Sequence, residues 1–235
     1  MGLSLLEHDA NNFSTIFALY TDLLVDSKAD PSKIFNKPSY FLSYDKVQVW
    51  LSLMACISTG DEKFIIPIKP DDAKQFLVQI DGYRPNCSYQ FDGIEDVPSN
   101  VYLAMHQLVK NSAENLEDAK KKPRHPNKIE DKIEIILKNK ADSYTLIVKD
   151  AGTGIPSDKL PIIFGAYTDG GTGIGLQVVK RIADLRKGYV EVVSTPGERT
   201  FRYNTHSGEF SEMWRQPQGT TFTLCLPKAI NRHYL

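Results

Sequence analysis

Two glycine clusters and one aspartate carry the clearest chemical signal in the chain. The first cluster follows Asp150 in the run Asp-Ala-Gly-Thr-Gly-Ile-Pro, and the second occupies residues 171–176, Gly-Thr-Gly-Ile-Gly-Leu. Glycine lets the main chain approach a ligand closely, and glycines that open a helix leave free N–H groups at the positive end of its dipole. The second cluster therefore predicts a phosphate-binding turn. The Asp150 carboxylate ends a strand-like run and suits the amino group of a base, so together they indicate a nucleotide.

Two familiar glycine-rich sites do not match this pattern. The chain has no Gly-x-x-x-x-Gly-Lys-Ser/Thr run, which excludes a P-loop. The dinucleotide fingerprint needs its glycines near the first strand of a βαβ unit, with an acidic residue about 20 positions further on. Residues 171–176 have a different glycine spacing and lie late in the chain.

A row of amides precedes the glycine clusters. Gln107, Asn111 and Asn115 recur every four residues in a run that we expect to be helical, so they share one face. Pro98 stands at the expected start of this helix, where its missing N–H costs little. The opposite side is expected to hold Met105, Leu108, Ser112 and Leu116. This amide helix is the further element that a third type of nucleotide site requires.

The order of these features resembles that of a known family. The amide helix is followed by Asp-x-Gly-x-Gly, a turn containing Phe164, Gly-x-Gly-x-Gly-Leu and, at residues 219–222, Gly-Thr-Thr-Phe. This order is similar to the ATP-binding domain of sensor histidine kinases, in the superfamily shared with DNA gyrase, MutL and mitochondrial protein kinases. The resemblance covers roughly residues 63–228, and the ordered set of motifs is far more specific than any single one.

The resemblance implies a role for each matching residue, with ATP and Mg²⁺ as the cofactors. Asn111 would bind the magnesium ion, Asp150 would accept a hydrogen bond from the adenine amino group, and Thr220 would support that contact. Gly152 and Gly154 would line the base and the sugar. The second cluster would complete the nucleotide site, with its glycines at the phosphates: Gly171, Thr172, Gly173, Gly175 and Leu176.

Gln107 departs from the family pattern, because kinases of this type usually carry asparagine at this position. Its amide could still contact the metal ion or a phosphate, so we include it in the expected nucleotide site. Hydrolytic relatives place a glutamate base at this position. The glutamine therefore argues against gyrase-like or chaperone-like hydrolysis of ATP.

The predicted fold class is α+β. Apolar residues recur with helical spacing in residues 3–26 and again in residues 47–57, so each expected helix has one apolar face. Pairing with a second copy of the chain would form a four-helix bundle that buries these apolar faces. We therefore expect a dimerising helical hairpin at residues 1–60. Residues 61–235 are expected to form a two-layer α/β sandwich with a mixed, mainly antiparallel sheet. We expect residues 197–218 to form a hairpin inserted between two strands, and this hairpin is either a surface ornament or a partner-docking element.

A second motif lies in the first expected helix, in the run Glu-His-Asp-Ala-Asn-Asn at residues 7–12. An imidazole is neutral and nucleophilic near pH 7, and it can attack a phosphoryl group held in line. This run is similar to the phosphoacceptor box of histidine kinases. By that resemblance His8 is the phosphoacceptor, Asp9 accepts its proton, and Asn12 is an amide that assists phosphatase activity. The alternative is a histidine without a role on an exposed helix face.

Composition narrows the partner classes. A net charge of −1 over 235 residues argues against nucleic acid as the main partner. The three cysteines form no CxxC pair or metal-binding spacing, as expected in a reducing compartment. No apolar run reaches the about 18 residues that a membrane span needs, and no signal-like core is visible. We therefore expect a cytoplasmic protein without a membrane span. Since no sensor region precedes His8, we expect the regulatory signal to come from another protein or from a longer chain of which this sequence is a fragment.

These features predict an ATP-dependent protein histidine kinase of two-component signalling. It would phosphorylate its own His8 and pass the phosphoryl group to an aspartate of a response-regulator receiver domain, and a phosphatase activity could accompany this reaction. Two alternatives stay open. One is a histidine phosphotransfer scaffold that does not use ATP itself, and the other is a mitochondrial-type protein serine kinase, which would need a much longer N-terminal helical domain.

Overall fold

The computed structural model describes residues 65, 67–78, 86–121, 132–165 and 174–228. The predicted helical hairpin of residues 1–60, with its four-helix bundle and dimer, lies outside the described residues. The same holds for part of the predicted site, namely His8, Asp9, Asn12, Gly171, Thr172 and Gly173.

The described part is built on a seven-stranded sheet with the strand order β2-β4-β5-β9-β6-β7-β8. Its strands are β2 (Cys87–Asp92), β4 (Ile133–Asn139), β5 (Ser143–Asp150), β6 (Tyr189–Thr195), β7 (Thr200–Asn204), β8 (Phe210–Met213) and β9 (Gly219–Pro227). Strands β2 and β4 are parallel, and the other neighbouring pairs are antiparallel. The predicted mixed, mainly antiparallel sheet is confirmed. A separate short ladder pairs β1 (Pro67–Ile68) with β3 (Val97–Pro98).

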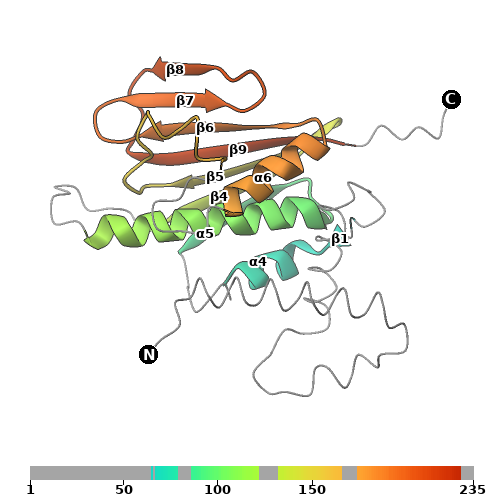
Figure 1. The fold of residues 1–235 in the computed structure, drawn as a ribbon. Helices are drawn as coiled ribbons and strands as arrows, with labels where there is room; N and C mark the ends of the chain where they lie inside the picture. Colours follow the sequence, from blue (N-terminus) through green and yellow to red (C-terminus); the bar gives the residue numbers. More distant parts are fainter. Residues whose placement is uncertain (1–64, 66, 79–85, 122–131, 166–173, 229–235) are drawn as a thin grey trace, which may run out of the picture. The chain divides into compact units, whose positions relative to one another are not determined.

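Helices cover one face of this sheet, which confirms the two-layer α/β sandwich (Figure 1). They are α4 (Pro70–Val78), α5 (Ser99–Lys121) and α6 (Ile174–Leu185). Helices α5 and α6 contact each other, and they pack on β5 and β6, respectively. Every second residue of the central strands is buried beneath them, because side chains alternate between the two faces of a strand. The buried strand residues include Leu146, Val148, Val190, Val192, Phe222 and Leu224.

Strand register brings three distant positions together at one end of the sheet. Asp150, the last residue of β5, is paired with Thr220 near the start of β9. Thr220 is also paired with Ser194 near the end of β6. Because paired residues of antiparallel strands point to the same face, all three side chains lie on the buried side, toward the helices. The register therefore places the predicted acid and threonine next to each other.

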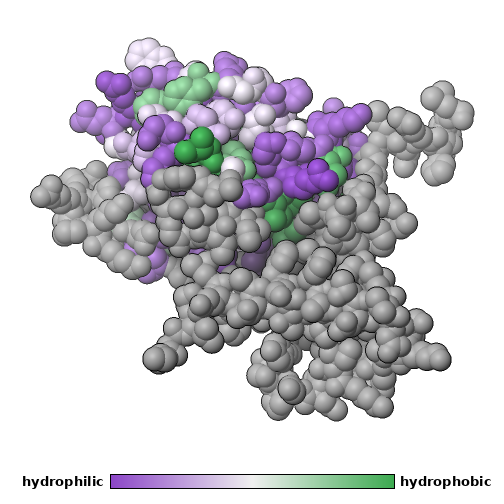
Figure 2. Space-filling model, viewed as in Figure 1, coloured by the Kyte–Doolittle hydropathy of each residue, from purple (hydrophilic) through white to green (hydrophobic). Residues whose placement is uncertain are grey.

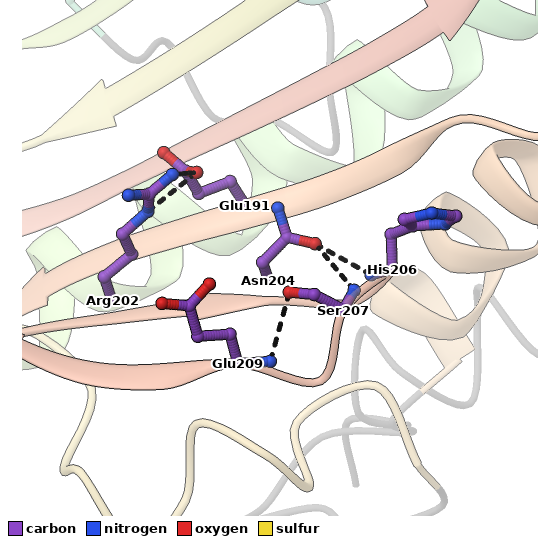
Figure 3. Close-up of polar contacts among 6 residues, drawn as sticks. All are labelled: Glu191, Arg202, Asn204, His206, Ser207 and Glu209. Carbon is purple, nitrogen blue, oxygen red and sulfur yellow. Dashed lines mark hydrogen bonds and ion pairs between the residues drawn. The ribbon is translucent and has the colours of Figure 1, made fainter.

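The β7–β8 hairpin extends the sheet beyond β6. Its turn is held by Asn204, whose Oδ1 accepts hydrogen bonds from the backbone N–H groups of His206 and Ser207, and Glu209 N donates to Ser207 Oγ (Figure 3). On the sheet, Arg202 forms an ion pair with Glu191 of β6. Exposed ion pairs contribute little stability, so the backbone ladder and the turn bonds hold the hairpin in place.

Three large exposed hydrophobic side chains lie on or directly after β8: Phe210, Met213 and Trp214. Ile162, in the turn after β5, is also exposed. Figure 2 shows a mainly hydrophilic face with hydrophobic side chains over the β7–β8 hairpin. The choice between a surface ornament and a partner-docking element stays open for this segment. Among the described residues, no helix has both the length and the apolar character needed to cross a bilayer.

Helix α6 ends in a residue that stores local strain. Lys187 adopts a left-handed backbone conformation (φ 53°), while Gly188 N bonds to Ala183 O and Lys187 N bonds to Asp184 O. This is the hydrogen-bond pattern of a Schellman cap, in which glycine is favoured at the left-handed position. We expect Lys187→Gly to raise the free energy of unfolding by about 0.5–1 kcal/mol, measured by urea unfolding. Lys140→Gly, at an exposed position of ordinary φ, is the control and should lower it; a loss of stability in Lys187→Gly would contradict the prediction.

Candidate nucleotide site

The amide face of α5 lies against the start of α6. A Cβ atom added to Gly175 would lie 2.8 Å from Gln107 Oε1 and 3.8 Å from Asn111 Oδ1. Gly175 and Leu176 belong to the first turn of α6, where backbone N–H groups have no partner within the helix. The structure therefore brings two of the predicted amides to the helix end that the second glycine cluster opens.

Asp150 is the centre of a group of hydrogen bonds that we call the carboxylate cluster: Asp150, Ser112, Asn115, Gly152 and Thr220. Its Oδ1 accepts from Gly152 N at 2.9 Å, Asn115 Nδ2 at 3.2 Å and Thr220 N at 3.3 Å. Its Oδ2 accepts from Ser112 Oγ at 3.1 Å. The side chain is 4% exposed, so a buried acid is held in a fixed orientation by four donors.

Burial and hydrogen bonding act on Asp150 in opposite directions. Removing the carboxylate from water raises its pKa to about 6, although the four hydrogen bonds favour the charged form. The aspartate thus changes its charge at about pH 6, close to neutrality. Such a shifted acid inside a cluster of polar groups is typical of a functional site.

This pKa has a consequence for stability. The folded protein holds the Asp150 proton more tightly than the unfolded chain, in which the pKa of this carboxyl is near 3.8. Protonation of Asp150 therefore stabilises the fold fully below about pH 4, and this contribution is lost as the pH rises through about 6. We expect the free energy of unfolding of the ligand-free protein to lose up to about 3 kcal/mol over this range through Asp150. In urea unfolding at several pH values, Asp150→Asn should lack this loss. Parallel pH profiles of the two proteins would contradict the assignment.

Two glycines of the first cluster are required by close contacts. A Cβ at Gly152 would lie 2.7 Å from Asn115 Cγ and 2.9 Å from Asp150 Oδ1. Gly154 has a left-handed backbone (φ 74°), and its Cβ would lie 2.7 Å from the carbonyl carbon of Thr195. Next to it, Ile155 N donates to Ser194 Oγ at 2.6 Å. The loop after β5 is therefore pressed against α5 on one side and against β6 on the other.

The turn that follows this loop is also anchored. Phe164 is buried and stacks on Tyr203 of β7, with ring centroids 6.5 Å apart. Gln177 Nε2 in α6 donates to Gly165 O at 3.0 Å. The phenylalanine of the predicted motif thus packs on the β7–β8 hairpin.

Two buried polar atoms fit a nucleotide and a metal ion. Within the described part of the chain, Asn111 Nδ2 and Thr220 Oγ1 have no hydrogen-bond partner. A buried polar atom left without a partner costs about 1–3 kcal/mol, so a polar ligand would remove this cost at both positions. An asparagine amide can present either its nitrogen or its oxygen after a half-turn, and amide oxygen is a ligand that Mg²⁺ accepts. These residues are therefore compatible with Mg-ATP.

The predicted position of Ser112 on the helix was wrong. It was expected opposite the amides, but its hydroxyl donates to Asp150. On a helix, residue 112 lies only about 100° from residue 111, so it stands at the border between the amide face and the apolar stripe. Three further residues of the site had no predicted role, namely Asn115, Thr153 and Ser194. For Asn115 the four-residue spacing from Asn111 was the available signal.

Comparison with known proteins agrees with this geometry. The family model of histidine kinase-, DNA gyrase B- and HSP90-like ATPases matches residues 100–230. This protein therefore belongs to that family and carries its ATP-binding domain, and its relatives are sensor histidine kinases.

The curated relatives align over short stretches. The chain is 38% identical over 78 residues to the sensor histidine kinase YxdK of Bacillus subtilis, which is 30% of this chain and 24% of that protein. It is 41% identical over 58 residues to the histidine kinase/phosphatase NtrB of Rhodobacter capsulatus, 23% of this chain and 16% of that protein. The chain thus spans about a quarter or less of the length of these relatives. Among solved structures, the mycobacterial sensor histidine kinase MprB matches with a TM-score of 0.44 and 18% identity, over 69% of this chain and 97% of that one.

Proposed function

We propose that the protein is an ATP-dependent protein histidine kinase of two-component signalling. The observation that carries the proposal is the carboxylate cluster at the end of the α5 amide row, a buried acid with fixed orientation. Asn111 of the same helix and Thr220 of the cluster each add a buried atom that has no hydrogen-bond partner among the described residues. Membership of a family of ATP-binding domains and relatives that are sensor histidine kinases support it.

In this proposal each residue of the predicted site contacts one part of the nucleotide. Asp150 accepts a hydrogen bond from the adenine amino group, and Thr220 Oγ1 supports the base beside it. Gly152 and Gly154 line the base and the sugar. Asn111 would ligate Mg²⁺ through its amide oxygen, and Gln107 would be a second amide close to the metal ion and the phosphates. The phosphates lie at the second glycine cluster: Gly171, Thr172, Gly173, Gly175 and Leu176.

The chemical step belongs to the N-terminal motif. A ring nitrogen of His8 attacks the γ-phosphorus, the N–P bond forms, and the bond from that phosphorus to the β–γ bridging oxygen breaks, so that ADP leaves. Asp9 accepts the imidazole proton. The phosphoryl group then passes to an aspartate of a response-regulator receiver domain, and Asn12 orients water when the phosphorylated regulator is hydrolysed. A homodimer through residues 1–60 would present two such histidines.

Labelling with γ-³²P-ATP and Mg²⁺ tests this function. We expect phosphate that is labile in acid and stable in alkali, carried by His8 and lost in His8→Gln. His206→Gln, which changes an exposed histidine of the hairpin turn, is the matched control and should label normally. Equal labelling of His8→Gln and the wild type would rule out His8. A wild-type protein that binds no ATP but accepts phosphate from another phosphorylated protein would favour the phosphotransfer scaffold instead.

A further inference from the structure

Asn115 uses both ends of its side-chain amide within the site. Its Nδ2 donates to Asp150 Oδ1 at 3.2 Å, and its Oδ1 accepts from Thr153 Oγ1 at 2.9 Å. An ionised carboxylate only accepts hydrogen bonds, so the amide nitrogen has to face Asp150, and the amide oxygen then faces the hydroxyl. One residue of α5 thus ties the end of β5 to the loop that follows it.

The donors are distributed unequally between the two oxygens of Asp150. Oδ1 takes three hydrogen bonds, one of them from Asn115, whereas Oδ2 takes one from Ser112. Each carboxylate oxygen offers about two lone-pair directions, so Oδ1 is fully used and Oδ2 keeps room for another donor. We propose that Asn115 is a positioning residue for adenine recognition, which fixes the Asp150 carboxylate so that Oδ2 stays available to the amino group of the base. This inference rests on the proposed function and names a specificity device within its site.

The packing around Gly152 supports this role independently. A Cβ on residue 152 would lie 2.7 Å from Asn115 Cγ, which is closer than real side-chain carbons approach one another. The glycine therefore leaves the space that the Asn115 amide occupies. Close packing against residue 152, together with its two hydrogen bonds, holds the Asn115 amide in one orientation, as a positioning role requires.

Charged side chains do not account for the pKa of Asp150, which depends on its burial and its hydrogen bonds. The strongest influences on its pKa are burial and the donors from Gly152, Ser112, Thr220 and Asn115, none of which is charged. Lys149 precedes Asp150 but points to the opposite face of the sheet, where it pairs with Glu134. Glu114, beside Asn115 in α5, is exposed. Removing the Asn115 donor should therefore favour the protonated acid, because the lost hydrogen bond stabilises the charged form.

Nucleotide selectivity and its pH dependence test the inference. Binding of ATP and of purine riboside triphosphate, which lacks the amino group, would be measured across pH for the full chain. Asn115→Ala should weaken ATP by about tenfold and the purine analogue far less, and the acidic midpoint of ATP affinity should move to higher pH. Asn115→Asp keeps the size and the acceptor for Thr153 but puts a second carboxylate beside Asp150, so its midpoint should move further. Asn139→Ala, in which an exposed asparagine is removed, is the control.

The outcomes distinguish a failure of the positioning role of Asn115 from a failure of the proposed function. If Asn115→Ala and Asn115→Asp keep the wild-type preference for ATP over the purine analogue and the wild-type pH midpoint, the positioning role is wrong. Equal weakening of both nucleotides would also overturn it, since a merely structural residue would act in that way. A wild-type protein that binds neither nucleotide would instead contradict the proposed function.

Discussion

Replacing Asp150 with asparagine is expected to abolish useful ATP binding while leaving the fold intact. The amide oxygen can accept the three hydrogen bonds now made to Oδ1, and the amide nitrogen can donate to Ser112 Oγ, which is able to accept. The folded protein should even gain stability at neutral pH, because a buried charge is removed. The adenine amino group, however, would meet a donor instead of an acceptor. We expect a loss of affinity of at least about 100-fold.

The same variant should change the preference between bases. An amide nitrogen at the place of Oδ2 could donate to the 6-oxo group of inosine triphosphate, so the ratio of ATP to inosine triphosphate affinity should fall in Asp150→Asn. Asp92→Asn, at an exposed acid of β2, is the matched control and should bind like the wild type. Titration calorimetry of both nucleotides measures the effect. Wild-type ATP affinity in Asp150→Asn would show that the base does not contact this residue.

A single methyl group at position 152 is expected to disrupt the site nearly as strongly. The Cβ of Gly152→Ala would overlap the Asn115 amide and approach Asp150 Oδ1 to 2.9 Å, so the amide must move away from the carboxylate. We expect ATP affinity to fall by about 30-fold or more, because a donor to the acid is lost and the loop after β5 is displaced. Equilibrium binding of ATP measures the effect.

A double-mutant cycle shows whether the overlap with Asn115 is the cause. If the methyl group acts through the amide, Gly152→Ala should cost little when Asn115 is already alanine, so the two changes would be strongly non-additive. Additive losses would mean that the methyl group acts independently of the Asn115 amide. Unchanged affinity in Gly152→Ala alone would contradict the close packing described for this loop.

The sandwich was predictable because its strands alternate between buried and exposed residues. Leu146 and Val148 on β5, and Phe222, Leu224 and Leu226 on β9, follow the period of two that a sheet with one covered face imposes. The ordered motifs then implied which residues meet. Thr220 was expected to support the contact of Asp150, and the structure places it directly opposite in the β5–β9 register.

The hydrogen bonds of the site could not be predicted, because they depend on how helices and strands pack. Asn115 and Ser112 reach Asp150 only through the position of α5 on β5, which the order of residues in the chain does not define. Ser194 meets Ile155 across 39 residues of sequence, and the stacking of Tyr203 on Phe164 requires the path of the β7–β8 hairpin. The predicted roles of His8, Asp9 and Asn12 lie outside the described residues and stay predictions.

The most direct measurement of the central claim is a crystal structure of the full chain with Mg²⁺ and a non-hydrolysable ATP analogue. We predict that the adenine amino nitrogen lies within about 3 Å of an Asp150 carboxylate oxygen, with Thr220 beside the base and Asn111 at the metal ion. An analogue bound with its base away from Asp150, or a metal ion held by residues other than Asn111, would contradict the account.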